Sequence, residues 1–257
     1  MNNLFQKATK NTAKLRLALS GPSGSGKTYT ALLLASNLCT NGKPPKVAVA
    51  DTEHGSASKY ADLFDFDVVN FESPFHPDRY GKLIQMAGEN GYDVLVIDSL
   101  SHAWNGTGGM LEIVDELKAR NRSNNSMAVW QEATPIHNRL IENIIAAPLH
   151  IIATMRSKQE YLIEKDDGGK VSVRKMGLAP IQRDGMEYEF DVWGEMDINN
   201  RLIVSKTRCP ELNGRVIEKP GAEMAEALCA WLVTTSSSNG TMSPGEVSEK
   251  LYSQEAV

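Results

Sequence analysis

Eight consecutive residues constrain the fold of this chain more than any other stretch. Residues 21–28 read Gly-Pro-Ser-Gly-Ser-Gly-Lys-Thr and match the phosphate-binding pattern G-x-x-x-x-G-K-[ST] at every fixed position. A strand-like segment, residues 15–19, precedes the loop, and a strong helix former, residues 29–38, follows it. The glycines let successive N–H groups and a helix N-terminus point at an anion. The pattern predicts a nucleoside triphosphate site, against the alternative of a chance match in a Gly/Ser-rich loop.

The predicted site has two roles beyond binding the phosphates. Lys27 would reach the β- and γ-phosphates, and the Thr28 hydroxyl would ligate Mg²⁺. Asp98 ends the apolar run of residues 93–98, so its carboxylate can reach the same Mg²⁺ through water, unless it is simply a strand-ending Asp. The loop residues expected to contact the nucleotide are Gly21, Ser23, Gly24, Ser25, Gly26, Lys27 and Thr28.

Strand and helix patterns alternate along most of the chain. Strand-like runs at 46–51, 67–71, 93–98 and 149–155 alternate with helical patterns at 78–90, 111–122 and 135–147. This rhythm predicts an α/β fold with a mainly parallel twisted sheet and helices on both faces. A polar hairpin over 161–174, paired strands at 188–196 and 201–205 joined at Asn199-Asn200, and a last helix at 221–232 predict a C-terminal antiparallel extension.

Composition limits the domain organisation and the compartment. The 257 residues are expected to form a basic N-terminal arm (1–14), one ATPase core (15–233) and a mildly acidic, disordered tail (234–257). Net charge is −5, so any nucleic-acid binding must use local patches. Three cysteines without C-x-x-C spacing, no apolar leader and no membrane-spanning run favour a cytoplasmic protein without membrane contact.

Hydrolysis needs a group that activates water near the γ-phosphate. The best candidate is Glu53, which follows the strand-like run 46–51 and which we expect at the end of the strand next to the phosphate loop. On spacing alone, a surface glutamate is an equally good interpretation.

Residues 51–54, Asp-Thr-Glu-His, followed by Lys59-Tyr60-Ala61, are similar to a segment of the RecA family. That resemblance implies that Glu53 activates water and that Tyr60 stacks on adenine, so the nucleotide would be ATP. Asp98-Ser99-Leu100 also resembles the RecA Walker B motif, and residues 155–158 lie where the RecA core strand enters its second DNA-binding loop. Residues 205–210 resemble the segment that offers two basic residues, here Lys206 and Arg208, to the γ-phosphate of the neighbouring subunit.

The resemblance covers about residues 13–232. Together with its small size, this makes the chain similar to the phage-encoded, core-only RecA-like proteins of recombination and single-strand annealing. It implies a DNA-stimulated ATPase that binds single-stranded DNA and assembles head to tail into a ring or filament in the bacterial host cytoplasm. A single-strand-binding protein is a further candidate partner. Phe5-x-x-Ala8 resembles the docking plug of eukaryotic relatives. One position departs from RecA, because Thr154 stands where RecA has a γ-phosphate-sensing glutamine, which leaves Arg156 or Gln159 for that role.

Two regions are candidates for DNA contact. Trp104, in the glycine-rich segment 101–109, would stack a base, although a buried Trp that caps the sheet is at least as good an interpretation. Basic residues in the second region would track phosphates, but a solvated hairpin has the same composition. These residues are Arg156, Lys158, Lys170, Arg174 and Lys175.

Other functions remain open at this point. A different oligomeric DNA motor, of the helicase or packaging type, uses the same core but normally adds a domain. A P-loop kinase for a small molecule needs an Arg-rich lid. This interpretation also does not explain why Glu53 occurs together with the basic pair Lys206 and Arg208. A non-enzymatic switch would use the nucleotide only to control assembly.

Overall fold

The computed structural model describes residues 13–38, 43–120, 126–165 and 171–232, and only the backbone of residues 160–165 and 171–176. The expected arm, with its Phe5-x-x-Ala8 segment, therefore lies outside the described residues except for Ala13 and Lys14. The expected tail at 234–257 also lies outside them.

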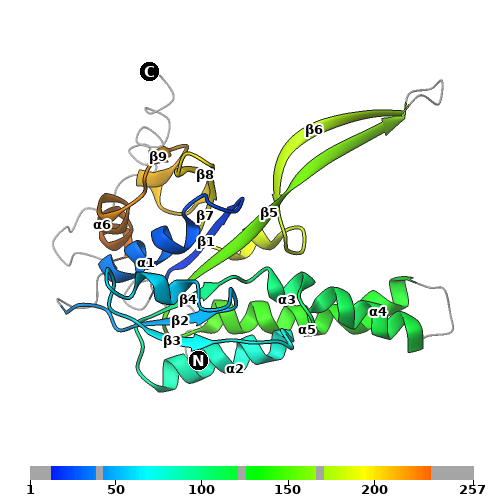
Figure 1. The fold of residues 1–257 in the computed structure, drawn as a ribbon, viewed down its shortest axis with the longest axis horizontal. Helices are drawn as coiled ribbons and strands as arrows, with labels where there is room; N and C mark the ends of the chain where they lie inside the picture. The colour runs from blue at the N-terminus through cyan, green and yellow to red at the C-terminus, as the bar shows by residue number, and fades with distance from the viewer. Residues whose placement is uncertain (1–12, 39–42, 121–125, 166–170, 233–257) are drawn as a thin grey trace, which may run out of the picture.

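The centre of the fold is a parallel sheet whose strands run in the order β3-β2-β4-β5-β1-β7 (Figure 1). Short apolar runs form β1, β2 and β4, and these strands are almost completely buried, as expected for a sheet covered on both faces. Strand β5 lies between β4 and β1. The strands are β1 (Arg16–Gly21), β2 (Val47–Asp51), β3 (Asp67–Asn70), β4 (Val94–Asp98), β5 (His150–Lys165) and β7 (Val192–Met196).

Antiparallel pairing extends the sheet in two places. Strand β8 (Arg201–Thr207) returns along β7, and β9 (Val216–Glu218) pairs with β8. The β7–β8 turn includes Asn200 at a φ of 61°, a conformation that asparagine tolerates well. Strand β6 (Val171–Pro180) pairs with the outer half of β5 in a long hairpin that projects from the body of the protein (Figure 1).

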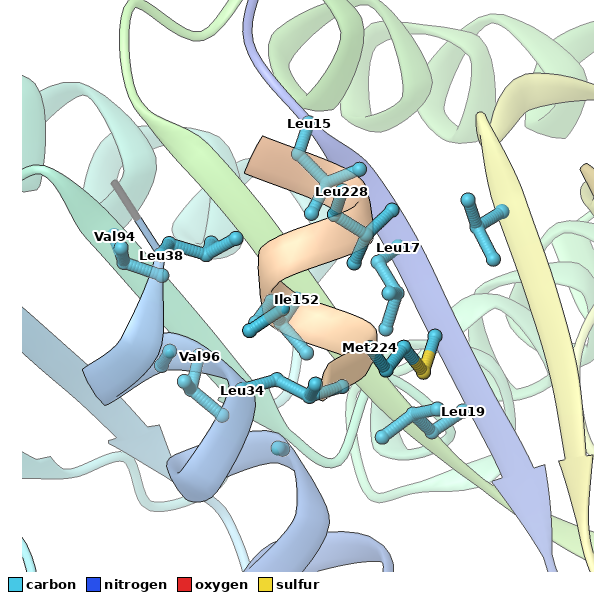
Figure 2. Close-up of a cluster of buried hydrophobic side chains, with 14 of the residues drawn as sticks. Leu15, Leu17, Leu19, Leu34, Leu38, Val94, Val96, Ile152, Met224 and Leu228 are labelled. Carbon is cyan, nitrogen blue, oxygen red and sulfur yellow. The ribbon is translucent and has the colours of Figure 1, made fainter. Parts of the chain in front are cut away.

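Helices cover both faces of the sheet. Alternate side chains of β1 divide between the two faces, so that Leu17 and Leu19 pack under one helix layer and Ala18 under the other. Helices α1 (Lys27–Asn37) and α6 (Ala222–Leu232) cover the first face, shown in Figure 2. Helices α2 (Pro77–Glu89) and α5 (Ser126–Ala146) cover the second. The predicted α/β class, with a mainly parallel sheet, helices on both faces and a C-terminal antiparallel extension, is confirmed.

Shorter elements connect these layers. Helix α4 (Met110–Arg120) packs against the first half of α5 in a small separate core. The remaining elements are α3 (His102–Asn105) and the 3₁₀ turns η1 (Ala57–Tyr60), η2 (Met186–Glu189) and η3 (Pro210–Leu212). No helix in the described part of the chain is both long and apolar enough to cross a bilayer.

Several predicted boundaries are wrong. The strand expected over 149–155 continues to Lys165 as β5, so it also forms the first arm of the hairpin expected over 161–174. The helix expected to begin at Pro135 begins at Ser126, and the proline lies inside it. Val129 and Ala133 are buried against α4, and this packing outweighs the one backbone hydrogen bond that a proline removes. The strand expected over 188–196 begins at Val192, because residues 186–189 form the turn η2.

Candidate nucleotide site

The predicted phosphate loop forms the turn between β1 and α1. Gly24 and Gly26 have φ angles of 78° and 83°, in the left-handed region that residues with a side chain rarely adopt. Gly26 is the N-cap of α1, and no side chain accepts a hydrogen bond at this cap. The first N–H groups of the helix are therefore available to an anion, and the helix dipole favours negative charge there.

Lys27 lies across this loop. Its Nζ donates hydrogen bonds to the carbonyl oxygen of Pro22 at 2.7 Å and to Ser25 Oγ at 3.5 Å. Burial lowers the pKa of Lys27, while the carboxylates of Asp98 and Glu53 act in the opposite direction. The ammonium is thus within electrostatic range of both predicted carboxylates, so the three predicted groups converge on one site.

Asp98 is held by a hydroxyl on each oxygen. Thr28 Oγ1 donates to Asp98 Oδ2 at 2.7 Å, and Thr154 Oγ1 donates to Asp98 Oδ1. Burial raises the pKa of Asp98, and the two hydroxyl donors partly offset that rise. Carboxylate and hydroxyl oxygens are the ligands that Mg²⁺ prefers. This donor set fits Mg²⁺, which Thr28 would hold directly and Asp98 through water.

Glu53 forms a two-point ion pair with Arg156. Arg156 Nε donates to Glu53 Oε1 at 2.8 Å, and Nη2 donates to Oε2. Burial alone would raise the pKa of Glu53, but the Arg156 hydrogen bond and charge outweigh it and hold the pKa below its usual value. Arg156 is the register partner of Gly21, the first residue of the phosphate loop. The ion pair therefore stands beside that loop.

The expectation that Glu53 follows the strand next to the phosphate loop is wrong. Two strands, β4 and β5, lie between β2 and β1, because β5 inserts beside β1. Glu53 still reaches the site through the bent loop after β2. Asp51 fixes that loop by accepting the backbone N–H groups of Glu53 at 2.6 Å and Ala57 at 2.8 Å.

Thr52 and His102 support this arrangement through hydrogen bonds between two loops. Thr52 Oγ1 accepts the backbone N–H of Ser99 at 2.7 Å and lies 2.6 Å from His102 Nδ1. Burial lowers the pKa of His102, against the attraction of the Glu53 carboxylate. These contacts tie the loop after β2 to the loop after β4, next to Asp98.

Tyr60 lines a cavity of about 400 Å³ that begins at the phosphate loop and follows α1. The Tyr29 and Tyr60 rings meet edge to face, with centroids 5.9 Å apart. The cavity adjoins the phosphate loop, and its size is typical of ligand pockets. Of the residues that line the cavity, sequence patterns pointed to Gly26 and Tyr60. The others are Tyr29, Thr30, Leu33, Asn200, Lys219 and Pro220.

Arg208 lies near the start of β1, at the end of the strand opposite its own phosphate loop, and Lys206 lies level with the middle of β1. Arg208 Nη1 donates to Asp191 Oδ1 at 2.9 Å, and Asp191 Oδ2 accepts the backbone N–H of Arg16 at the start of β1. Lys206 Nζ donates to three carbonyl oxygens around η2, at Glu187, Tyr188 and Phe190. This placement excludes action on the nucleotide of the same subunit, so the role predicted for these residues needs a neighbouring subunit.

The predicted DNA-binding residues are dispersed. Arg156 belongs to the nucleotide site, whereas Lys158 is exposed two residues further along β5. Lys170 lies outside the described residues, and only the backbone of Arg174 and Lys175, on β6, is described. Trp104 is half-buried and stacks on Trp130 of α5 with centroids 6.1 Å apart, so it belongs to the small core between α4 and α5 and does not cap the sheet.

The strand–loop–helix phosphate site, the Asp98 carboxylate and Glu53 define a P-loop nucleotide-binding α/β protein. A family model described as AAA domain matches residues 13–224, so the chain belongs to the AAA-domain family of P-loop ATPases. No curated protein matches this chain. Among solved structures, the chain is similar to a KaiC-like protein from the hyperthermophilic archaeon Pyrococcus horikoshii OT3. The two share 15% identity over 78% of this chain and 82% of that one, with a TM-score of 0.41.

Proposed function

We propose that this P-loop ATPase is a RecA-like, single-stranded-DNA-binding protein that acts in phage-type recombination or strand annealing and hydrolyses ATP at subunit interfaces. One observation carries the proposal. Arg156 holds Glu53 beside the phosphate loop, and the same strand, β5, continues into the projecting β5–β6 hairpin. A nucleotide-dependent change at Arg156 therefore acts directly on the hairpin where the sequence places basic residues.

The residues around the loop divide the chemistry. Lys27 would neutralise charge on the β- and γ-phosphates, and Thr28 with Asp98 would hold Mg²⁺, which would supply positive charge to stabilise the transferred phosphoryl group. Glu53 orients the attacking water and accepts its proton. With Arg156 attached, Glu53 has a lowered pKa and is a poor base. Transfer of Arg156 from Glu53 to the γ-phosphate would restore the basicity of Glu53 and report nucleotide binding to β5.

This scheme also assigns a role to Thr154. A threonine at this position is shorter than glutamine and already donates to Asp98. It therefore cannot extend to a γ-phosphate as well. Arg156, two residues later on the same strand, has the length and the charge to do so.

Assembly is the second part of the proposal. Arg208 is more than half-exposed. It lies near the start of β1, at the end of the strand opposite its own phosphate loop, and one of its nitrogens pairs with Asp191. In a head-to-tail ring or filament, the end of the sheet that carries Arg208 would face the nucleotide of the next subunit. There Arg208 would stabilise charge on the γ-phosphate, while Lys206 holds the η2 turn in place.

Steady-state ATP hydrolysis with and without single-stranded DNA tests the proposal. We expect DNA to stimulate the wild type, and we expect both Glu53→Gln and Arg208→Ala to lose turnover. Arg215→Ala is the matched control, because Arg215 is an exposed arginine without a side-chain partner in the described part of the chain. Mixing Glu53→Gln with Arg208→Ala should restore activity at mixed interfaces. Turnover indifferent to DNA, or unaffected by Arg208→Ala, would refute this mechanism and favour a kinase or a switch.

A further inference from the structure

Glu53 needs a second support once Arg156 moves to the γ-phosphate. In the structure the two-point ion pair with Arg156 holds the Glu53 carboxylate. The backbone N–H of Glu53 donates to Asp51 Oδ1, but this hydrogen bond fixes the shape of the loop after β2 and not its place beside the phosphate loop. A base that acts on an attacking water must be held in position. The contacts that bind the loop after β2 to its neighbours therefore decide how well Glu53 works.

Thr52, the residue before Glu53, makes these contacts. It is buried, and its backbone N–H donates to the carbonyl oxygen of Asp98 at 2.7 Å. Its Oγ1 accepts the backbone N–H of Ser99 at 2.7 Å and lies 3.2 Å from the Ser99 carbonyl oxygen and 2.6 Å from His102 Nδ1. The side chain of Thr52 thus joins the loop after β2 to the segment that follows β4.

His102 provides the shortest of the three contacts to the Thr52 hydroxyl. A hydroxyl has one proton to donate and two lone pairs, so Oγ1 satisfies all three contacts in one arrangement. There it accepts from the Ser99 N–H and from His102 Nδ1–H and donates to the Ser99 carbonyl. If it donates to His102 Nδ1 instead, it gives up the longer contact with the Ser99 carbonyl. Both arrangements keep the hydrogen bond to His102.

The His102 ring is itself held in place. It stacks on Phe75, with centroids 4.8 Å apart and an angle of 21° between the planes. The Phe75 N–H donates to the Thr107 carbonyl at 2.7 Å, and the His102 carbonyl accepts the Gly106 N–H at 2.9 Å, so both rings belong to one hydrogen-bonded segment. The Glu53 carboxylate is close enough to raise the pKa of His102, against the larger effect of burial. His102 is therefore a fixed side chain next to the catalytic loop.

We propose that His102 is a positioning residue for ATP hydrolysis, which holds Glu53 beside the phosphate loop, through the Thr52 hydroxyl, after Arg156 has left it. This inference rests on the proposed function only in requiring that Glu53 activates the attacking water. His102 acts through another residue, so its loss should reduce kcat and leave nucleotide affinity in place. The phosphate loop and Asp98 keep their own contacts to the nucleotide and Mg²⁺.

Three variants separate the hydrogen bond from the packing of the ring. His102→Phe keeps an aromatic ring on Phe75 and removes the hydrogen bond. His102→Asn places an amide near the position of Nδ1 and can restore that bond. Thr52→Val removes the hydroxyl at nearly the same shape. The matched control is His76→Asn, because His76 follows Phe75 but caps helix α2, where asparagine is an equally good cap.

Steady-state ATP hydrolysis and equilibrium ATP binding measure the effects. We expect His102→Phe to lower kcat by about tenfold, the effect of losing one hydrogen bond, with ATP affinity unchanged. His102→Asn should recover most of this loss, and His76→Asn should match the wild type. Thr52→Val should lower kcat further, since it also leaves the Ser99 N–H without its acceptor. Adding His102→Phe to Thr52→Val should have no additional effect, because both remove the same contact.

The Glu53→Gln background shows whether His102 acts through Glu53. There His102→Phe should not lower the residual turnover, and a further tenfold loss would overturn the inference. A wild-type kcat in His102→Phe would overturn it too, as would an equal loss of ATP affinity, which indicates a general structural role. If DNA does not stimulate the wild type but His102→Phe lowers kcat alone, the proposed function fails and the role of His102 stands. If the wild type does not hydrolyse ATP, or Glu53→Gln keeps its turnover, both fail.

Discussion

Arg16 is a buried cation that holds two layers of the fold together. Its side chain is only 6% exposed. Nη1 donates to the carbonyl oxygens of Leu15 at 3.0 Å and Leu149 at 2.9 Å, and Nη2 donates to those of Ile145 at 2.8 Å and Ala147 at 2.6 Å. The guanidinium thus caps the C-terminal end of α5 and fixes it at the start of β1, directly below the phosphate loop.

Replacing Arg16 by Met keeps most of the apolar length and removes all four donors. The Leu15 carbonyl keeps the backbone N–H of Ile151 at 2.9 Å, so three carbonyls lose their donor, at about 1–3 kcal/mol each. The variant no longer buries a charge, and this offsets part of the loss, because burial lowers the pKa of Arg16 and so disfavours its charged form. We therefore expect a net loss of about 3–5 kcal/mol in the free energy of unfolding, less than the full cost of three carbonyls without donors.

Urea unfolding, followed by circular dichroism, measures this loss as a fall of about 1–2 M in the midpoint. Arg16→Lys should recover only part of it, because one ammonium cannot reach four carbonyls in the plane of a guanidinium. Arg215→Met, at an exposed arginine, is the control and should leave the midpoint in place. An Arg16→Met midpoint within about 0.3 M of the wild type would show that water or local rearrangement satisfies the carbonyls and that the reasoning is wrong.

Three further predictions concern the site and its surroundings. Glu53→Gln should reduce the rate of ATP hydrolysis by about 10²–10⁴-fold while nucleotide binding persists, because an amide cannot accept the proton of the attacking water; wild-type turnover would contradict this. Thr154→Val removes one donor from Asp98, whose pKa burial already raises, and should increase the Mg²⁺ concentration for half-maximal turnover by about tenfold, the effect of losing one hydrogen bond to a charged group. An unchanged Mg²⁺ titration would exclude this role of Thr154. Burial lowers the pKa of His150 to about 4, and Leu15 donates its N–H to His150 Nδ1 at 2.9 Å. Because the unfolded chain takes up this proton near pH 6.5 and the folded chain does not, stability should fall by about 2 kcal/mol between pH 7 and pH 5. His150→Asn, which keeps an acceptor but does not titrate, should reduce that dependence, and an equal pH dependence in the variant would refute it.

Local sequence predicted those parts of the fold whose signals are local. The phosphate loop, the strand before it and the helix after it are contiguous, so one pattern contains all the information for Lys27 and Thr28. The apolar run ending at Asp98 likewise defines a buried strand without help from the rest of the chain. Both predictions depend only on backbone preference and burial.

Other parts depend on which segments become neighbours, which no local pattern encodes. Two strands, β4 and β5, separate the strand before Glu53 from the strand that carries the loop, and β5 brings Thr154 and Arg156 into the site instead. Pro135 gives a helix-start signal, but packing of the preceding residues against α4 extends the helix past it. Asn200 is an ordinary turn residue until the fold places it against Gly26.

Strand β5 is a single continuous element that spans the nucleotide site and the hairpin. It runs beside β1 and β4 up to Arg156 and then continues to Lys165 without an intervening loop. From Thr154 to Lys165 the strand covers about 36 Å at 3.3 Å per residue. Its pairing with β6 shifts register once, between Glu160 and Tyr161, but the strand itself is not interrupted, so it can act as a lever that pivots between the phosphate loop and Asp98. A tilt of about 5° at Thr154 would move the backbone of Lys165 by about 3 Å, roughly the rise of one residue along a strand. Small changes at the pivot are thus converted into steps as large as the spacing of the backbone groups at the far end.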